Sequence, residues 1–325
     1  MKKIALIGAG QLGSRHLQGL AKSDLEISIE VVEPFEASRN TAKQRFEEIP
    51  LNEKILKIDF LETISLLSDE LDLVIVATNA DVRYKVVKEL LENKKVRNLV
   101  LEKVLFQKID EYKYVEELLT ETNTKCWVNH PRRMFPFYKN LKSELSNSKN
   151  INFSVSGGAW GLGCNGLHFL DCFSYLSSEK KIKLGSGLLD KKLYETKRVG
   201  FNEFNGMING TLSDNCTFSI NCFAEEISPV QFNITSDKLN ILIDESNGWY
   251  RISRKESSWK PEIKEEKIIY FQSELTNILL NDIFDDNCTL PTYDEAMALH
   301  INYLTLLIEH INSFSQTKYD FCPIT

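Results

Sequence analysis

Residues 4–13 read IALIGAGQLG, and this stretch decides the fold of the first part of the chain. Four apolar residues predict a buried strand, the pattern Gly-x-Gly-x-x-Gly follows without a gap, and residues 12–22 continue as a helix. In this pattern Gly8 permits the tight turn, Gly10 lets the backbone approach a pyrophosphate, and Gly13 lets the helix pack closely on the strand. The N–H groups at the start of the helix attract phosphates. The stretch therefore predicts a dinucleotide site formed by Gly8, Gly10, Gln11, Leu12 and Gly13.

Glu33 ends the next apolar run, about 20 residues beyond Gly13. A carboxylate at this distance accepts hydrogen bonds from the adenosine ribose and repels a 2′-phosphate. A glycine pattern alone also fits a structural turn, but strand, loop, helix and acid together favour a cofactor site. We therefore predict NAD rather than NADP as the cofactor.

The composition of the chain limits its partners. With 325 residues and 42% apolar content, the chain is long enough for two domains. A net charge of -7 with interspersed acids and bases offers no basic face for nucleic acid or membrane. The sequence shows no secretion signal and no spanning segment of about 18 apolar residues. Seven cysteines without a C-x-x-C pair predict reduced thiols and no metal cluster. We expect a cytoplasmic protein with a small-molecule partner.

Up to residue 128, apolar runs alternate with amphipathic helical stretches, which predicts an α/β domain with a doubly wound parallel sheet. The strands are expected at residues 4–7, 27–32, 55–58, 73–77, 99–101 and 126–128. Ligands bind such sheets at the carboxyl ends of the strands. Thr78 and Asn79, after the fourth strand, and Glu102 and Lys103, after the fifth, should therefore face the same crevice as the glycine loop.

After about residue 150 the pattern changes to alternating strands, so residues 129–325 are predicted to form an α+β domain with a large open, mainly antiparallel sheet. These strands are expected at residues 151–156, 204–212, 217–223, 230–235, 239–244 and 248–254, with helices at 166–176, 273–284 and 293–313. The last helix could pack back on the first domain. A sheet this large needs cover on its outer face, so we predict a homodimer or homotetramer. Residues 1–128 would bind NAD(P), and residues 129–325 would bind substrate and form the oligomer.

Two residues are candidates for proton and charge handling. Lys103 could donate to the cofactor ribose and stabilise a developing alkoxide, or it could be a solvated lysine paired with Glu102. His168 lies on the mostly apolar helix 166–176, with Asp171 on the same face. It is either the proton carrier of a hydride transfer or a satisfied core histidine.

Further side chains are candidate substrate contacts. Arg132 and Arg133 follow the sixth strand and could grip a carboxylate or phosphate, or could instead pin the joint between the domains. The glycine-rich loop 160–165 leads into the His168 helix and could close over a ligand, or be a plain irregular turn. The candidate substrate-binding residues are Arg132, Arg133, Trp160, Asn165 and Asp171.

Over essentially its whole length the chain resembles the glucose–fructose oxidoreductase / inositol dehydrogenase / MocA (Gfo/Idh/MocA) family of sugar oxidoreductases. The likeness is carried by GAGQLGSRH at 8–16, VATN at 76–79, EK at 102–103, RRMFP at 132–136 and HFLD at 168–171. It implies that Lys103 is the catalytic lysine of a Glu-Lys-Pro motif and that His168 is the acid/base histidine. The chain departs from the family pattern at four positions, which are Asn79, Arg83, Val104 and Cys164.

The resemblance implies an NAD(P)-dependent dehydrogenase or reductase acting on CH–OH groups. It would move a hydride between nicotinamide and a secondary carbinol or keto carbon of a sugar or sugar derivative, including a nucleotide-activated sugar of surface glycan biosynthesis. The same resemblance leaves two alternatives. One is an NAD-dependent glycoside hydrolase with transient oxidation, and the other is a dinucleotide-binding regulator without turnover.

Overall fold

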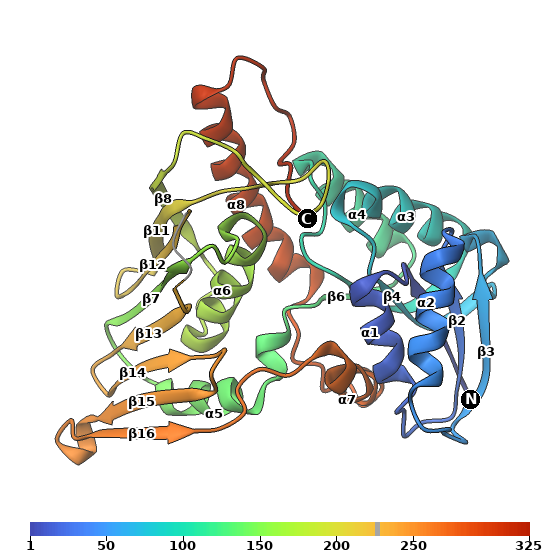
Figure 1. Cartoon of the computed structure of the whole chain (residues 1–325), viewed down its shortest axis with the longest axis horizontal. Helices are drawn as coiled ribbons and strands as arrows, with labels where there is room; N and C mark the ends of the chain where they lie inside the picture. The colour runs from blue at the N-terminus through green and yellow to red at the C-terminus, as the bar shows by residue number, and fades with distance from the viewer. Residues whose placement is uncertain (225–227) are drawn as a thin grey trace. The chain divides into compact units, whose positions relative to one another are not determined.

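The computed structural model describes residues 1–224 and 228–325, and the chain divides into two compact units (Figure 1). The first unit comprises Met1–Phe106, Asp110–Pro131 and Tyr270–Asp294. The second comprises Gln107–Ile109, Arg132–Ile269 and Glu295–Thr325. The long passage into the second unit begins after Pro131, close to the boundary expected after residue 128, but one later segment returns to the first unit.

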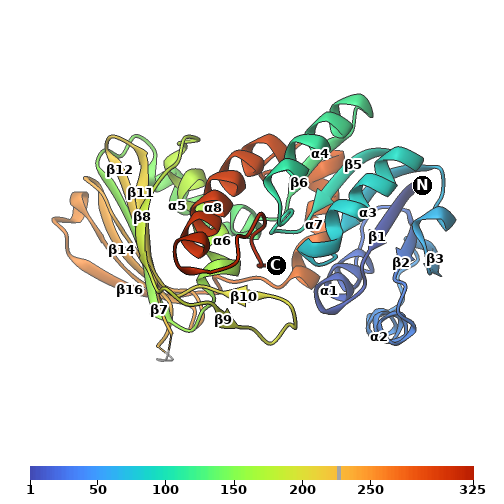
Figure 2. The ribbon, with the colours of Figure 1, turned by 90° about the horizontal axis from the view of Figure 1, so that it is seen from above.

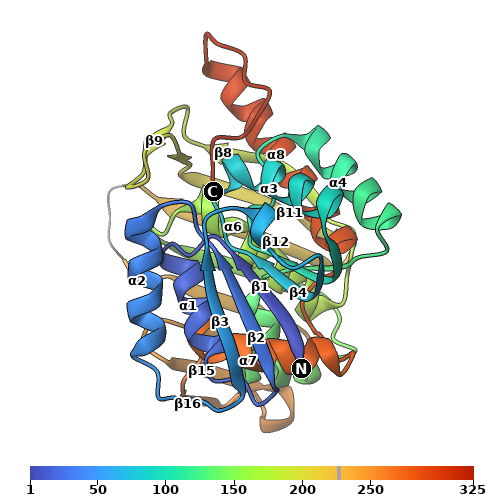
Figure 3. The ribbon, with the colours of Figure 1, turned by 90° about the vertical axis from the view of Figure 1, so that its right-hand side faces the viewer.

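The first unit contains a six-stranded parallel sheet with strand order β3-β2-β1-β4-β5-β6. Figure 3 shows β3, β2 and β1 side by side in that order. The four apolar residues of β1 that precede the glycine loop are all buried, as expected for a central strand. The predicted doubly wound parallel sheet is confirmed. The strands are β1 (Lys2–Ile7), β2 (Ile27–Val32), β3 (Ile55–Leu61), β4 (Glu70–Val76), β5 (Lys95–Leu101) and β6 (Lys125–Val128).

Helices connect these strands, and one helix from late in the chain joins them. Gly19 of α1 approaches Thr276 of α7 so closely that a Cβ on the glycine would lie 2.6 Å from the Cβ of Thr276. Leu275 and Leu279 of α7 are buried. The returning segment is therefore α7, whereas the sequence suggested the last helix. The helical elements of this unit are α1 (Gln11–Leu20), α2 (Glu36–Glu47), η1 (Ile64–Leu66), α3 (Ala80–Asn93), α4 (Ile109–Glu121) and α7 (Gln272–Phe284).

The second unit contains an eight-stranded sheet with strand order β16-β15-β14-β13-β7-β12-β11-β8. β7 and β12 pair in parallel and the other neighbours pair antiparallel, which confirms the predicted mainly antiparallel sheet. A separate pair of short strands, β9 (Tyr194–Glu195) and β10 (Asn202–Glu203), lies outside it. The large sheet contains β7 (Ile151–Gly158), β8 (Lys183–Leu189), β11 (Gly206–Ser213), β12 (Cys216–Phe223), β13 (Gln231–Thr235), β14 (Leu239–Asp244), β15 (Trp249–Arg254) and β16 (Pro261–Glu265).

The helices α5, α6 and α8 lie on one face of this sheet (Figure 2). A core of aromatic rings lies between the sheet and the helices. The ring centroids of Phe153 and Phe173, which are stacked, lie 4.8 Å apart, and those of Phe232 and Phe173 lie 5.5 Å apart. The opposite face of the sheet carries alternating polar residues. The sheet therefore supports α6 by its apolar face only. The helical elements of this unit are η2 (Pro131–Met134), α5 (Pro136–Leu145), α6 (Leu162–Ser177), η3 (Lys255–Ser257) and α8 (Tyr293–Phe314).

Candidate functional site

The glycine loop has the geometry of a phosphate cradle. Gly8 has φ of +87°, in the left-handed region that favours glycine, and a Cβ on Gly13 would lie 1.8 Å from the Gly8 carbonyl oxygen. Neither position tolerates a side chain. A Cβ on Gly10, in contrast, would meet nothing within 4 Å, so the backbone there faces open space at the start of α1. Such a space beside free helix N–H groups fits a pyrophosphate.

Glu33 lies directly beside this loop. Its side chain is almost fully buried, and its two oxygens are fixed by backbone donors, with Ala9 N–H at 2.8 Å from Oε2 and Phe35 N–H at 3.1 Å from Oε1. Each oxygen retains an accepting position for a ribose hydroxyl. The carboxylate is therefore anchored to the glycine loop in a single orientation.

Gln11 is held by a residue that sequence reasoning missed. Arg45 of α2 donates from Nη2 to Gln11 Oε1 at 2.8 Å and from Nη1 to Ser14 Oγ at 2.5 Å. Gln18 in turn donates to the carbonyl oxygen of Arg45 at 3.1 Å. These contacts fix the outer side of the first turn of α1. Nothing in the local pattern of α2 distinguishes Arg45 from a solvated arginine.

Thr78 and Asn79 follow β4, at the same sheet edge as the glycine loop. A Cβ on Gly8 would lie 2.9 Å from the Thr78 backbone nitrogen, which shows how closely the two turns approach. The Thr78 hydroxyl oxygen is buried and has no hydrogen-bond partner within the described residues. A buried hydroxyl of this kind calls for an acceptor or donor from a bound molecule. Together with the open space at Gly10, it fits a dinucleotide.

Glu102, at the end of β5, is the centre of a buried polar network. It is 3% exposed, and its Oε1 accepts from His16 Nε2 at 2.9 Å and from Asn129 Nδ2 at 2.5 Å. His16 Nδ1 lies 3.0 Å from Thr276 Oγ1, which itself donates to the Gln272 carbonyl oxygen. The threonine hydroxyl has one proton, which it gives to Gln272, so both ring nitrogens of His16 face acceptor oxygens.

The charge of His16 accounts for the titration of its partner. Burial alone would raise the pKa of Glu102, but the hydrogen bond and charge of His16, with smaller contributions from Asn129 and Arg83, hold that pKa below its usual value. Glu102 is therefore a carboxylate in a desolvated ion pair. Lys103 follows it directly and is half-buried, while Val104 is fully buried. The sequence offered Lys103 as one alternative partner of Glu102, and the structure shows His16 and Asn129 as hydrogen-bond partners of this carboxylate.

In the second unit, α6 presents a narrow polar face. Cys164, Asn165 and His168 are half-buried, whereas most of the helix around them is buried. These positions are one turn apart and share a side of the helix. Asn165 Nδ2 donates to the Trp160 carbonyl oxygen at 2.7 Å, and Trp160 Nε1 donates to the Asn221 carbonyl oxygen at 2.9 Å. The loop before the helix is therefore fixed by its own side chains.

A second feature missed by sequence reasoning lies at the start of α6. Glu203 of β10 accepts from the backbone N–H groups of Gly163 at 2.7 Å and Cys164 at 3.1 Å. A carboxylate at this position compensates the helix dipole. The anion-binding capacity of the α6 N-terminus is thus used by the chain itself. The contact joins residues about 40 apart, so no local pattern announces it.

Arg132 and Arg133 are paired within the second unit. Arg132 forms a two-point contact with Glu245 at 2.8 and 2.6 Å, and Tyr138 also donates to Glu245. Burial would raise the pKa of Glu245, but Arg132 and Tyr138 lower it below the usual value. Both guanidinium groups already bind carboxylates, so a substrate anion would have to displace a side chain.

Asp171 is the carboxylate bound by Arg133, at 2.7 Å from Nη2 and 3.0 Å from Nε. Its burial outweighs the charge of Arg133 and raises its pKa. The structure therefore assigns Asp171 to Arg133, and a role for Asp171 in orienting His168 or binding substrate stays a prediction. The sequence-predicted site residues fall into two groups, one in each unit.

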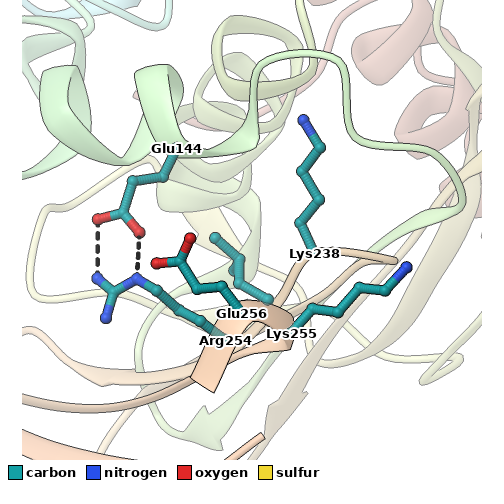
Figure 4. A pocket seen from close by; sticks show the side chains of 6 residues that line it. Glu144, Lys238, Arg254, Lys255 and Glu256 are labelled. Atoms are coloured by element: carbon teal, nitrogen blue, oxygen red, sulfur yellow. Dashed lines mark hydrogen bonds and ion pairs between the residues drawn. The ribbon is translucent and has the colours of Figure 1, made fainter. Parts of the chain in front are cut away.

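A hollow of about 630 Å³ in the second unit is a different kind of site (Figure 4). Arg254 binds Glu144 through Nε at 2.8 Å and Nη2 at 3.0 Å, and Lys238 Nζ donates to the Ser146 carbonyl oxygen. Because these charges are paired with the chain itself, the hollow is not a candidate active site. Its lining residues are Glu144, Lys238, Leu239, Arg254, Lys255 and Glu256.

The described residues form neither a metal-binding cluster nor a membrane-spanning helix. Within residues 1–224 and 228–325, no cluster of three or more His, Cys, Asp or Glu side chains could hold a metal ion. The helices of the described segments are all too short or too polar to span a bilayer. All seven cysteines are free thiols, and burial raises the pKa of Cys216 to about 11.

Residues 2–130 match the family described as "Oxidoreductase family, NAD-binding Rossmann fold" (GFO_IDH_MocA). None of the curated proteins compared with the chain matches it. The chain is similar to the solved structure of the dehydrogenase MviM from Clostridium difficile, with 18% identity, a TM-score of 0.71, and coverage of 96% of this chain and 99% of that one. It is also similar to UDP-N-acetylglucosamine 3-dehydrogenase GnnA from Acidithiobacillus ferrooxidans, with 14% identity, a TM-score of 0.71, and coverage of 96% and 98%.

The same fold occurs in a protein of another class. The transcriptional regulator Gal80p from Kluyveromyces lactis has 14% identity and a TM-score of 0.74, with 96% of this chain and 89% of that one covered. Similarity at such low identity shows the fold alone, whereas the family match covers the glycine loop and the segment through Lys103. Residues 2–130 therefore form the NAD-binding Rossmann domain of the Gfo/Idh/MocA oxidoreductase family.

Proposed function

We propose that the protein is an NAD-dependent oxidoreductase that moves a hydride between nicotinamide and a secondary carbinol or keto carbon of a sugar or sugar derivative. One observation carries the proposal, which is the arrangement at one edge of the parallel sheet. The open space at Gly10, the anchored carboxylate of Glu33 and the half-buried Lys103 follow the carboxyl ends of β1, β2 and β5 of the same parallel sheet. Ligands of open parallel sheets bind at this edge.

The preference for NAD rests on the charge beside the ribose site. Glu33 presents a fixed carboxylate, which repels a 2′-phosphate. Arg39 is the cation that could offset it, but this guanidinium donates to the Glu33 carbonyl oxygen at 2.6 Å and pairs with Glu62 at 2.9 Å. Two of its donors are thus engaged by the chain itself, which favours NAD.

The chemistry assigned to the side chains follows from their charge and exposure. NAD supplies the hydride acceptor at C4 of its nicotinamide ring when bound. Lys103 would hold the substrate oxygen by its ammonium group and stabilise negative charge as the C–H bond breaks. His168, on the polar face of α6, would take the hydroxyl proton during oxidation and return it during reduction.

The substrate class is the least constrained part of the proposal, and we favour a nucleotide-activated sugar. The fold shared with a UDP-N-acetylglucosamine 3-dehydrogenase supports this choice. Trp160 and Asn165 would line the sugar position beside His168. Because Arg132 and Arg133 are already paired, we propose that a phosphate would be met by other cations, of which Lys197 and Arg198 are exposed.

We also propose a cytoplasmic homodimer or homotetramer that assembles through the outer face of the large sheet. The outward side chains of its central strands are uncharged, so a second copy could cover them without burying charge. They include Ser154 and Ser156 of β7, Ser219 and Asn221 of β12, and Asn233 of β13. Light scattering on the purified protein tests the assembly, and a monomer at micromolar concentration would refute it.

The test of the activity uses the full-length protein. Calorimetry with NAD and NADP measures cofactor binding, and formation of NADH is followed with UDP-N-acetylglucosamine and a panel of free sugars. Lys103→Met and His168→Asn should each lower the rate by about 10²–10⁴-fold while NAD binding is largely kept. Lys95→Met is the matched control, because Lys95 lies exposed at the opposite end of the same strand and pairs with Glu70.

The outcomes separate the competing functions. Near-normal turnover in Lys103→Met would refute the assigned chemistry. NAD binding without turnover on any sugar would favour a regulator, and the similar Gal80p is a transcriptional regulator. Prolonged cleavage of glycosides from one bound NAD, with no net NADH, would favour the hydrolase.

A further inference from the structure

Arg83 of α3 is a buried cation that donates to backbone carbonyl groups. The side chain is 2% exposed. Its Nη1 donates to the carbonyl oxygens of Val104 and of Leu105, the latter at 3.1 Å, and its Nη2 donates to the carbonyl oxygen of Thr78. The guanidinium plane directs these donors in fixed directions. One side chain thus joins the turn after β4 to the segment after β5.

The two joined segments are those that carry the predicted cofactor contacts. Thr78 lies in the turn that approaches Gly8, and Val104 follows Lys103 directly. On the other side of Lys103, the carboxylate of Glu102 is held by His16 and Asn129. The backbone of Lys103 therefore lies between two anchored neighbours.

The chemistry of Arg83 indicates more than packing. A buried cation is costly unless it is well solvated by the protein, and a neutral or apolar side chain would fill the same volume at less cost. Arg83 is not placed to bind a substrate anion, because its donors point at carbonyl groups and its side chain is buried. Its planar guanidinium group instead sets the distance between the turn after β4 and the segment after β5.

We propose that Arg83 is a positioning residue that fixes Lys103 relative to the Thr78 turn, so that cofactor and substrate oxygen meet the ammonium group in one geometry. This inference rests on the proposed function. Arg83 itself touches neither cofactor nor substrate.

The first experiment needs no cofactor. Hydrogen–deuterium exchange of the full-length protein is compared for wild type, Arg83→Met, Arg83→Lys and the control Arg97→Met. Arg97 lies on β5 but is exposed and pairs with Asp72. We expect Arg83→Met to accelerate exchange together in peptides covering residues 77–80 and 102–106, Arg83→Lys to do so less, and Arg97→Met to leave both unchanged. Unchanged exchange in either peptide would overturn the proposal.

The second experiment asks whether Arg83 acts through Lys103. The rate of NADH formation at saturating NAD, with the substrate that the wild type turns over, is measured for Arg83→Met in the wild-type background and in the Lys103→Met background. We expect a loss of about tenfold in the first and a clearly smaller loss in the second, because coupled residues are non-additive. Equal losses in both backgrounds, with no recovery in Arg83→Lys, would assign Arg83 a purely structural role and overturn the proposal.

Two safeguards keep the result interpretable. If wild type forms no NADH, the proposed function fails, while the exchange data still decide whether Arg83 couples the two segments. If Arg83→Met does not fold, Arg83→Lys takes its place in both experiments, because it keeps the charge and removes the planar fork.

Discussion

Replacing His16 by leucine should destabilise the first unit strongly, because it leaves the carboxylate of Glu102 buried without its cation. The two side chains are 0% and 4% exposed, and Nε2 lies 2.9 Å from Oε1. Removing one partner of a buried ion pair costs about 3–5 kcal/mol. In a domain of about 150–250 residues each kcal/mol shifts Tm by about 2–4 °C, so we expect a fall of about 6–20 °C.

The effect should depend on pH with a definite sign. In the wild type the folded pKa of Glu102 is lowered, since His16 outweighs the effect of burial. The carboxylate therefore contributes stability above its unfolded pKa of about 4.3, and this is lost as pH falls through the lower folded pKa. In His16→Leu, no imidazole remains to offset the effect of burial on the Glu102 carboxylate. The difference in free energy of unfolding between variant and wild type is therefore largest near neutral pH and shrinks in acid.

Differential scanning calorimetry at a series of pH values measures this difference. His310→Leu is the control, since its ring is half-buried in the second unit and its Nε2 lies 2.9 Å from the carbonyl oxygen of Asp190 rather than beside a carboxylate. Adding Glu102→Gln to His16→Leu should regain part of the loss, because an amide carries no charge. A loss below about 1 kcal/mol, or the same loss at acid and neutral pH, would refute the ion-pair reasoning.

Two further predictions concern the other carboxylates. Glu33→Ala should weaken NAD binding and reduce the preference for NAD over NADP. Calorimetry with both cofactors measures this preference. An unchanged ratio of the two affinities would show that Glu33 does not contact the ribose. Glu245→Leu should lower the free energy of unfolding of the second unit by about 3–5 kcal/mol in urea, because Arg132 and Tyr138 lose their acceptor. Arg132→Met in the same chain should restore part of that stability, and additive losses would contradict the pairing.

Sequence patterns predicted the elements whose determinants are local. The apolar run of β1, the glycines after it and Glu33 follow one another within a short stretch, and parallel strands bring their carboxyl ends to one edge. Thr78 and Glu102 could therefore be assigned to the same edge as Gly8. In the second unit, strands with apolar alternation were found, whereas β16 was missed because all its residues are exposed.

Local sequence patterns could not predict contacts between residues that lie far apart in the chain. Glu245 binds Arg132 across 113 positions, and Thr276 binds His16 across 260. Periodicity reports which side of an element is buried but not what it meets. Arg83 illustrates the limit, because an arginine near the start of a helix looks solvent-exposed, while its acceptors are carbonyl groups that every residue carries.

The return of residues 270–294 to the first unit has a consequence for biosynthesis. The ring of His16 can contact Thr276, and α1 can pack against α7, only after more than a hundred intervening residues have been translated. The nascent amino-terminal half must therefore leave the ribosome with its core incomplete and one side of α1 uncovered. The maturation of the dinucleotide-binding part thus waits for nearly the entire polypeptide, because its last segment extends to Asp294 of 325 residues.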